Sequence, residues 1–120
     1  MDIIITDTET LEEIQTRFTA HFPYLKLEFY SREHAEGEGN SDDAKLDVHK
    51  RLSEIRSIHN SGELSIHGNQ KVSTLEQAFH DHYGLNAQVF RKSGNVWLQT
   101  TATDNWTLSE QNQTAEEHAV

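Results

Sequence analysis

Hydrophobic and polar positions alternate most clearly between Leu85 and Thr100, in two runs of β-forming residues that flank Ser93-Gly94. Such runs around a glycine are typical of a two-residue β-hairpin, because glycine adopts the positive φ that a tight turn needs. With Ser93 and Gly94 in the turn, Phe90 lies opposite Trp97. Alternation of side chains then gives the hairpin two faces, Ala87, Val89 and Leu98 on one, suited to packing under helices, and Gln88, Phe90, Trp97 and Gln99 on the other.

Two segments have the apolar spacing of amphipathic helices, and each begins with a capping-box pattern. The first follows Thr10 and ends at Pro23, because proline disfavours helical geometry in the residue before it. The second follows Ser73, whose capping box ends with Glu76, and it ends at Gly84, a residue typical of helix C-caps. Strands are predicted at residues 2–7, 25–30 and 63–67, and the three consecutive isoleucines of the first indicate a strand covered on both faces.

The order strand, helix, strand occurs twice, and this order predicts the fold class. Two βαβ units in succession are typical of the α+β ferredoxin-like (split βαβ) plan, an antiparallel sheet with two helices on one face. The C-terminal β-hairpin would extend this sheet. The two halves also share capping residues, since Thr10-Leu11-Glu12 matches Thr74-Leu75-Glu76. We interpret this match as a repeat of form.

Composition along the chain predicts the domain boundaries. We expect a single α+β domain at residues 1–112, with a flexible acidic insert at 31–45 and a frayed tail at 113–120. Residues 46–58 fit a short helix, which the spacing of their apolar residues favours, or a strand. Residues 101–112 fit a sixth strand or a helix that begins at the capping box from Thr107 to Glu110, and we favour the helix.

The net charge of −10 narrows the classes of partner. An acidic chain repels phosphate backbones and anionic lipids, so neither nucleic acid nor a membrane surface is expected as a partner. The absence of cysteine excludes disulfides and thiolate metal sites. The N-terminal segment lacks the basic region of a signal peptide, and no apolar run approaches ~18 residues. The sequence therefore favours a cytoplasmic protein.

The chain contains eight histidines, a residue type that can bind metal ions. His80 and His82 lie two residues apart on a predicted helix, so their side chains point about 200 degrees apart and cannot share an ion. No motif of a catalytic nucleophile is present, and Gly37 and Gly39 lie in an acidic stretch that would repel a phosphate. We therefore expect no metal site, no cofactor and no catalytic residue.

The first candidate binding surface is the hairpin face that carries Phe90 and Trp97, framed by Gln88 and Gln99. An aromatic pair in this position forms either a second, thinner core or a contact surface. On the second interpretation the chain is a noncatalytic interaction module. Its partner would be another protein or a second copy of the chain, bound on this face or along the free edge of the hairpin.

The second candidate is a groove lined by Arg91, Asp104 and Trp106, which forms if the C-terminal segment folds back over the hairpin. On this alternative hypothesis the chain is a small-molecule-binding protein or an enzyme. A surface ion pair of Arg91 or Lys92 with Asp104 would explain the same residues without a ligand. A third hypothesis, single-stranded RNA on the aromatic sheet face, is disfavoured by the net charge.

One further observation concerns the residues from Gln88 to Gly94, together with Trp97, Thr103-Asp104 and Trp106 to Leu108. Their pattern resembles a family of small, uncharacterised bacterial α+β domains, and the resemblance covers roughly Leu75 to Asn112. It implies a bacterial cytoplasmic origin. It implies no activity, substrate or catalytic residue.

Overall fold

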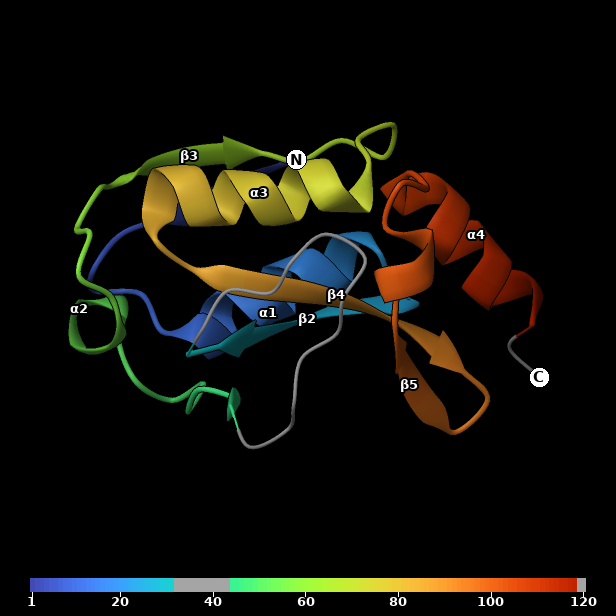
Figure 1. Cartoon of the computed structure of the whole chain (residues 1–120), viewed down its shortest axis with the longest axis horizontal. Coiled ribbons are helices and arrows are strands. Elements are labelled where there is room, and N and C mark those ends of the chain that lie inside the picture. Colours follow the sequence, from blue (N-terminus) through green and yellow to red (C-terminus); the bar gives the residue numbers. More distant parts are fainter. Residues whose placement is uncertain (32–43, 119–120) are drawn as a thin grey trace.

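The computed structural model describes residues 1–31 and 44–118, and within them the chain forms four α-helices and five strands (Figure 1). In chain order these are β1 (Asp2–Ile5), α1 (Leu11–His21), β2 (Leu25–Tyr30), α2 (Leu52–Ile55), β3 (Gly62–Ser65), α3 (Val72–Tyr83), β4 (Asn86–Ser93), β5 (Val96–Gln99), the short 3₁₀ helix η2 (Thr101–Thr103) and α4 (Leu108–Glu117).

The strands form two antiparallel sheets instead of the single sheet that the sequence predicted. β1 pairs with β3, and the second sheet has the order β2-β4-β5. The α+β class is confirmed, whereas these pairings do not give the ferredoxin-like topology. Pairing follows the apolar faces, because Leu27 lies opposite Val89 and Ile3 opposite Leu64, so buried residues of paired strands share one side.

One hydrophobic core joins both sheets to the helices. α1 packs against β2 and β1, and α3 packs against β4. Phe29 of β2 meets Phe79 of α3 edge to face, with ring centroids 5.6 Å apart, a geometry that aromatic pairs prefer. The fully buried apolar side chains include Ile3, Ile5, Leu11, Ile14, Phe18, Leu25, Leu27, Leu52, Ile66, Val72, Phe79, Val89 and Leu108.

The predicted helix ends are confirmed where a local steric rule decides them. α1 has Phe22 as its C-cap, directly before Pro23, and α3 ends at Gly84 with φ of 64°. Thr10 caps α1 through its hydroxyl, as predicted. The capping box predicted from Ser73 to Glu76 is wrong, because α3 begins at the buried Val72, one residue before Ser73.

The hairpin turn consists of Gly94 and Asn95, not of Ser93 and Gly94. Only Gly94 has a positive φ, 59°, which is typical of a type II′ turn with glycine in the first central position. Phe90 therefore lies opposite Gln99, and Trp97 lies opposite Lys92. Both residues of the predicted aromatic pair stay on one face, since the register moves by two positions and not by one.

Both halves of the chain contain the order strand, helix, strand and a further helix, and β5 and η2 precede the further helix in the second half. α1 and α3 bury apolar residues with the same spacing, and a constant offset relates Leu11 to Val72, Ile14 to Leu75, Phe18 to Phe79 and Phe22 to Tyr83. The repeat inferred from the sequence is thus present in the structure. Its alignment was wrong, because it matched Leu11 with Leu75.

The starts of the last helices of the two halves, α2 and α4, repeat as well. Leu52-Ser53-Glu54 begins α2, and Leu108-Ser109-Glu110 begins α4. In each half, the residue before this triplet forms an isolated β-bridge with the N-cap residue of the preceding long helix, Arg51 with Thr10 and Thr107 with Lys71. The starts of the two helices of each half are therefore joined by a β-bridge.

Reciprocal hydrogen bonds link the halves. Arg56, whose side chain is fully buried, donates to the carbonyl oxygen of Tyr83 at the end of α3, at 3.0 Å. Asn112 of α4 accepts a hydrogen bond from the amide of Tyr24, which follows α1, also at 3.0 Å. Arg56 in addition pairs with Asp7, with 2.9 Å between Nη2 and Oδ1. Each half thus holds the chain near the helix end of the other half.

Several segments differ in detail from the sequence expectations. The short helix favoured within residues 46–58 is found at Leu52–Ile55, and the helix favoured after Thr107 is found as α4 with a complete capping box. α4 continues through Glu117 with Ala115 buried, so residues 113–117 are helical instead of frayed. β1 is covered on one face only, since Ile4 is 48 % exposed. The insert expected at 31–45 falls mostly on residues 32–43, outside the described residues.

Candidate functional site

Phe90 and Trp97 lie in a small cluster on the face of the sheet that points away from the main core. Phe90 is only 6 % exposed and packs with Tyr30 and Ala44, and the half-buried Trp97 covers them. The ammonium of Lys26 lies 5.4 Å from the ring centroid of Phe90 and 5.0 Å from that of Trp97, within cation–π range. Phe90 is therefore part of a second, thinner core.

The two glutamines that frame this pair have unequal surroundings. Gln88 is fully buried, and its amide nitrogen donates to the carbonyl oxygen of Val89 at 3.0 Å. Gln99 is half-buried at the end of β5. Of the predicted face, the structure therefore leaves only Trp97 and Gln99 partly accessible.

A shallow groove of about 540 Å³ runs between α1 and β2, and Trp97 forms one wall of it. α1 closes the outer edge of β2 along this groove. Gln15 donates to the carbonyl oxygen of Leu27 at 2.8 Å, and Thr19 donates to that of Leu25 at 3.0 Å. These polar side chains take the place of a neighbouring strand, so the edge is not open to one.

The C-terminal segment folds back over the hairpin as the second hypothesis required, but it brings together only part of the predicted set. Arg91 lies 5.6 Å from the ring of Trp106 and donates to Gln111 Oε1 at 3.0 Å and Thr103 Oγ1 at 3.3 Å. Gln111 is fully buried and donates to Thr103 in turn. Asp104 lines a different cavity, so the three residues do not form one groove.

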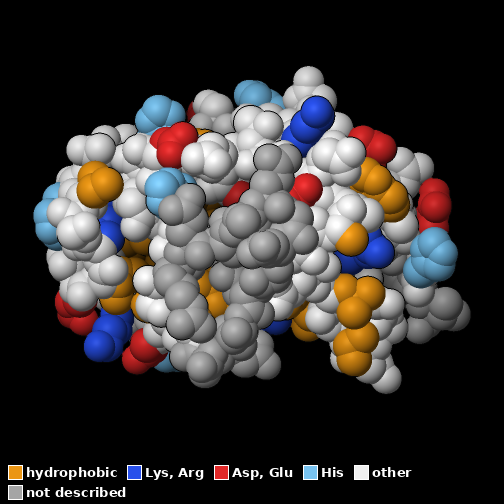
Figure 2. Space-filling view, viewed as in Figure 1, with side chains coloured by type: hydrophobic (Ala, Val, Ile, Leu, Met, Phe, Trp, Pro, Cys, Tyr) orange, Lys and Arg blue, Asp and Glu red, His pale blue; other side chains and the backbone are white. Residues whose placement is uncertain are grey.

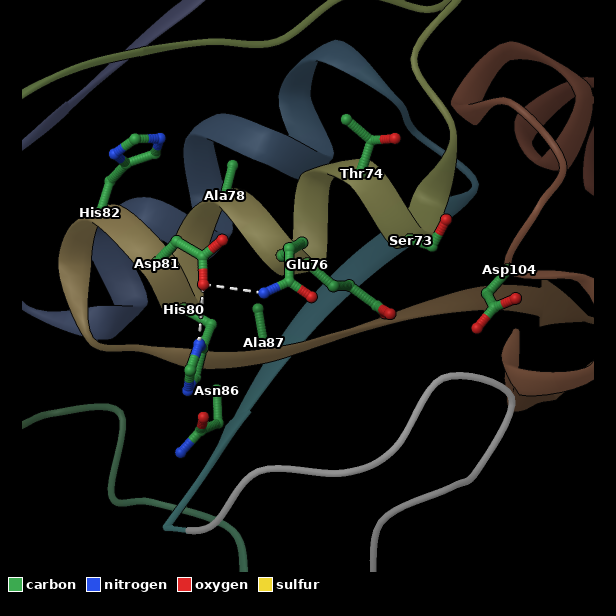
Figure 3. A pocket seen from close by; sticks show the side chains of 11 residues that line it. Ser73, Thr74, Glu76, Ala78, His80, Asp81, His82, Asn86, Ala87 and Asp104 are labelled. Atoms are coloured by element: carbon green, nitrogen blue, oxygen red, sulfur yellow. Dashed lines mark hydrogen bonds and ion pairs between the residues drawn. The ribbon is translucent and has the colours of Figure 1, made fainter.

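That cavity, of about 480 Å³, lies between α3 and β4 (Figure 3). Glu76 reaches from α3 toward the side that Asp104 occupies, and His80 with Asp81 lies toward the other end. His80 Nδ1 and Asp81 Oδ1 are 3.1 Å apart, and this hydrogen bond is the main cause of a lowered pKa of Asp81. The lining is polar and acidic.

Glu76 is a buried ionisable group that the sequence did not single out. β5 ends before it reaches the amide of Val89, because Thr100 donates to the carbonyl oxygen of Val89 and the chain then turns into η2. Instead, the amide of Val89 donates a hydrogen bond to Glu76 Oε2 at 2.9 Å. Burial raises the pKa of Glu76 to about 8, and the nearby charge of Asp104 adds to the rise. The helical spacing from Val72 to Glu76 and Phe79 was the available signal.

β5 is the most exposed apolar element of the second sheet. It is the last strand in the order β2-β4-β5, and it presents Val96, 56 % exposed, and Leu98, 42 % exposed. The sequence placed Leu98 under a helix, but α4 packs against β4 and β2 and leaves the outer strand uncovered. Figure 2 shows the apolar patch over β5 without an acidic side chain beside it.

Comparison with protein-family models, with curated proteins and with solved structures finds no match. In residues 1–31 and 44–118, no three histidine, aspartate or glutamate side chains are placed to hold a metal ion. The same part of the chain contains no helix with the length and apolar character needed to cross a membrane.

Proposed function

We propose that the chain is a noncatalytic interaction module that binds a protein segment along the outer edge of β5. The observation that supports this proposal is the exposure of Val96 and Leu98 on an edge strand. Apolar side chains on an uncovered edge are unusual in proteins that avoid association, because such an edge is a ready template for another strand.

The backbone of β5 is oriented for strand addition. In a two-residue hairpin the residues that flank the turn, Ser93 and Val96, exchange hydrogen bonds, and so does every second pair beyond them. The hydrogen bond from the Thr100 amide to the carbonyl oxygen of Val89 agrees with this alternation, because Thr100 and Val89 form one of these pairs. The amide and carbonyl of Trp97 therefore point to the outer edge, where an added strand would bind them.

The aromatic face supports this edge. Trp97 packs on Phe90 and under Lys26, which holds β5 against the sheet, while Val96 and Leu98 extend from the opposite side of the strand. Of the two surfaces that the sequence suggested, the aromatic face and the free edge of the hairpin, the edge is the one proposed to bind. The alternative, a small-molecule site made by Arg91, Asp104 and Trp106, has less support because Asp104 lines a separate cavity.

A selection of random peptides displayed on phage tests the proposal. Peptides that bind the wild-type chain are selected, and those that also bind the Val96→Lys/Leu98→Lys variant are removed. We expect apolar, extended peptides whose binding is lost in this variant and kept in Ile4→Lys, a matched control because Ile4 is also exposed on a strand, at 48 %. If no peptide shows this dependence on the edge, the proposal fails.

A further inference from the structure

We propose that the segment bound at this edge is β5 of a second copy of the chain, in an antiparallel pair related by a twofold axis. This inference rests on the proposed function and names its partner. In the pair, Trp97 lies opposite Trp97 of the second copy and the two residues exchange their outward amide and carbonyl bonds. The result is a continuous six-stranded sheet across two chains.

The register follows from which backbone groups are still available. The amides and carbonyls of Val96 and Leu98 point toward β4, whereas those of Trp97 point outward, so the central bonds of the pair come from Trp97. A twofold axis at Trp97 places Val96 opposite Leu98 of the second copy, and Leu98 opposite Val96. Shifting the partner strand by two residues either way leaves an apolar residue without an apolar partner. The exposed side chains of one copy thus cover those of the other.

Charge also favours this contact. The chain carries a net charge of −10, but residues 85–103 contain no aspartate or glutamate, and β5 itself has no charged residue. Lys92 lies opposite Trp97 in the hairpin, so the two copies of Lys92 are separated by three strand spacings, about 14 Å. That distance exceeds the Debye length of about 8 Å at physiological ionic strength, so their repulsion is screened.

The size of the contact predicts its strength. Two strands of four residues bury less than the roughly 1,200 Å² typical of stable complexes, so the dimer should be weak and form only as protein concentration rises. Because the interface is uncharged while the two chains repel each other, added salt should strengthen the association. An acidic peptide that bound through Arg91 and Lys92 would show the opposite salt dependence.

Cysteine cross-linking tests both the partner and the register, since the natural chain contains no cysteine. Val96→Cys and Leu98→Cys are prepared separately, then oxidised mildly either alone or as an equimolar mixture. The proposed register makes these two positions a non-hydrogen-bonded pair, with Cα atoms about 4.5 Å apart, a distance that suits a disulfide. We expect several-fold more disulfide dimer in the mixture than in either variant alone.

A mixture of Ile4→Cys with Leu98→Cys measures random collision, and circular dichroism shows that each variant is folded. Equal cross-linking in all mixtures, or stronger cross-linking of one variant with itself, would overturn the inference. Peptides that still bind the wild-type edge in that case would leave the proposed function standing with a different partner. If the peptide selection is empty as well, both the partner and the function are wrong.

Discussion

The helices α1 and α3 occupy equivalent positions in the two halves of the chain, but their side chains form different hydrogen bonds with the neighbouring strand. At one of the equivalent pairs, Gln15 of α1 donates to the carbonyl oxygen of Leu27 at 2.8 Å. Its counterpart Glu76 of α3 accepts from the amide of Val89 at 2.9 Å. Both side chains satisfy a strand edge, but only the second can change its charge.

The halves differ further in the path of the chain after the second strand of each unit. In the second half the chain turns back as β5, which extends the sheet and has an open edge of its own. In the first half, side chains of α1 close the corresponding strand. One repeated arrangement of elements therefore has a closed strand edge in the first half and an open strand edge in the second half. The features suited to binding lie on the open edge.

The largest effects should come from the core positions that the halves share. Phe18→Ala and Phe79→Ala each remove a fully buried ring from one common core, so each should lower the free energy of unfolding by about 3–5 kcal/mol. Chemical denaturation followed by fluorescence and by circular dichroism measures this. Two separate transitions in either variant would show that the halves fold independently, against the single core that joins them.

A smaller and pH-dependent effect should separate Glu76 from Gln15. The pKa of Glu76 is about 8 in the folded chain, above the ordinary 4.5, so the native state keeps a proton that the unfolded state releases. The free energy of unfolding should therefore fall as pH rises from about 4.5 to 8, by at most about 5 kcal/mol. Glu76→Gln should remove this fall and be more stable than wild type at pH 9.

The reverse exchange in the first half is the matched control. Gln15→Glu places a carboxylate against the carbonyl oxygen of Leu27, to which it cannot donate, and beside Glu28. This variant should be less stable than wild type at pH 7 and should recover part of the loss as acid protonates the new side chain. The free energy of unfolding of Glu76→Gln and Gln15→Glu is measured between pH 4 and 9. If both variants showed the same dependence on pH, the roles assigned to Glu76 and Gln15 would be wrong.

The smallest effect should distinguish the starts of α2 and α4. Thr107 forms a complete capping box with Glu110, whereas the equivalent Arg51 makes no side-chain capping bond. Thr107→Ala should cost about 1 kcal/mol, and Arg51→Ala only a few tenths. Urea denaturation resolves the two values, and an equal loss would mean that the cap contributes little beyond the β-bridge that both residues form.

Local chemistry made part of the fold predictable from the sequence. Pro23 and Gly84 end their helices through steric rules that involve only neighbouring residues, and the capping box at Thr107 is equally local. The same pattern from Ser73 to Glu76 was misleading, because burial of Val72 in the core decides where α3 begins. Gly94 was recognised as a turn residue, but its place within the turn depends on the strand register.

Contacts distant in sequence were beyond prediction. The pairing of β2 with β4 depends on how two faces fit after the chain has folded, so the separate sheets could not be read from periodicity. Arg91 and Trp106 were correctly grouped, but Asp104 lines a separate cavity together with Glu76. The exposure of Leu98 was missed because nothing in the hairpin sequence shows how far α4 extends over the sheet.

The side chains exposed along β5 are proposed to serve association and not folding. Sedimentation velocity over a range of concentrations distinguishes these two roles when the wild-type chain, Val96→Lys/Leu98→Lys and Ile4→Lys are compared in the same buffer. We expect the weight-average sedimentation coefficient to rise with concentration for wild type and Ile4→Lys and to stay at the monomer value for the double variant. Three coincident curves, at the monomer value or above it, would contradict the claim.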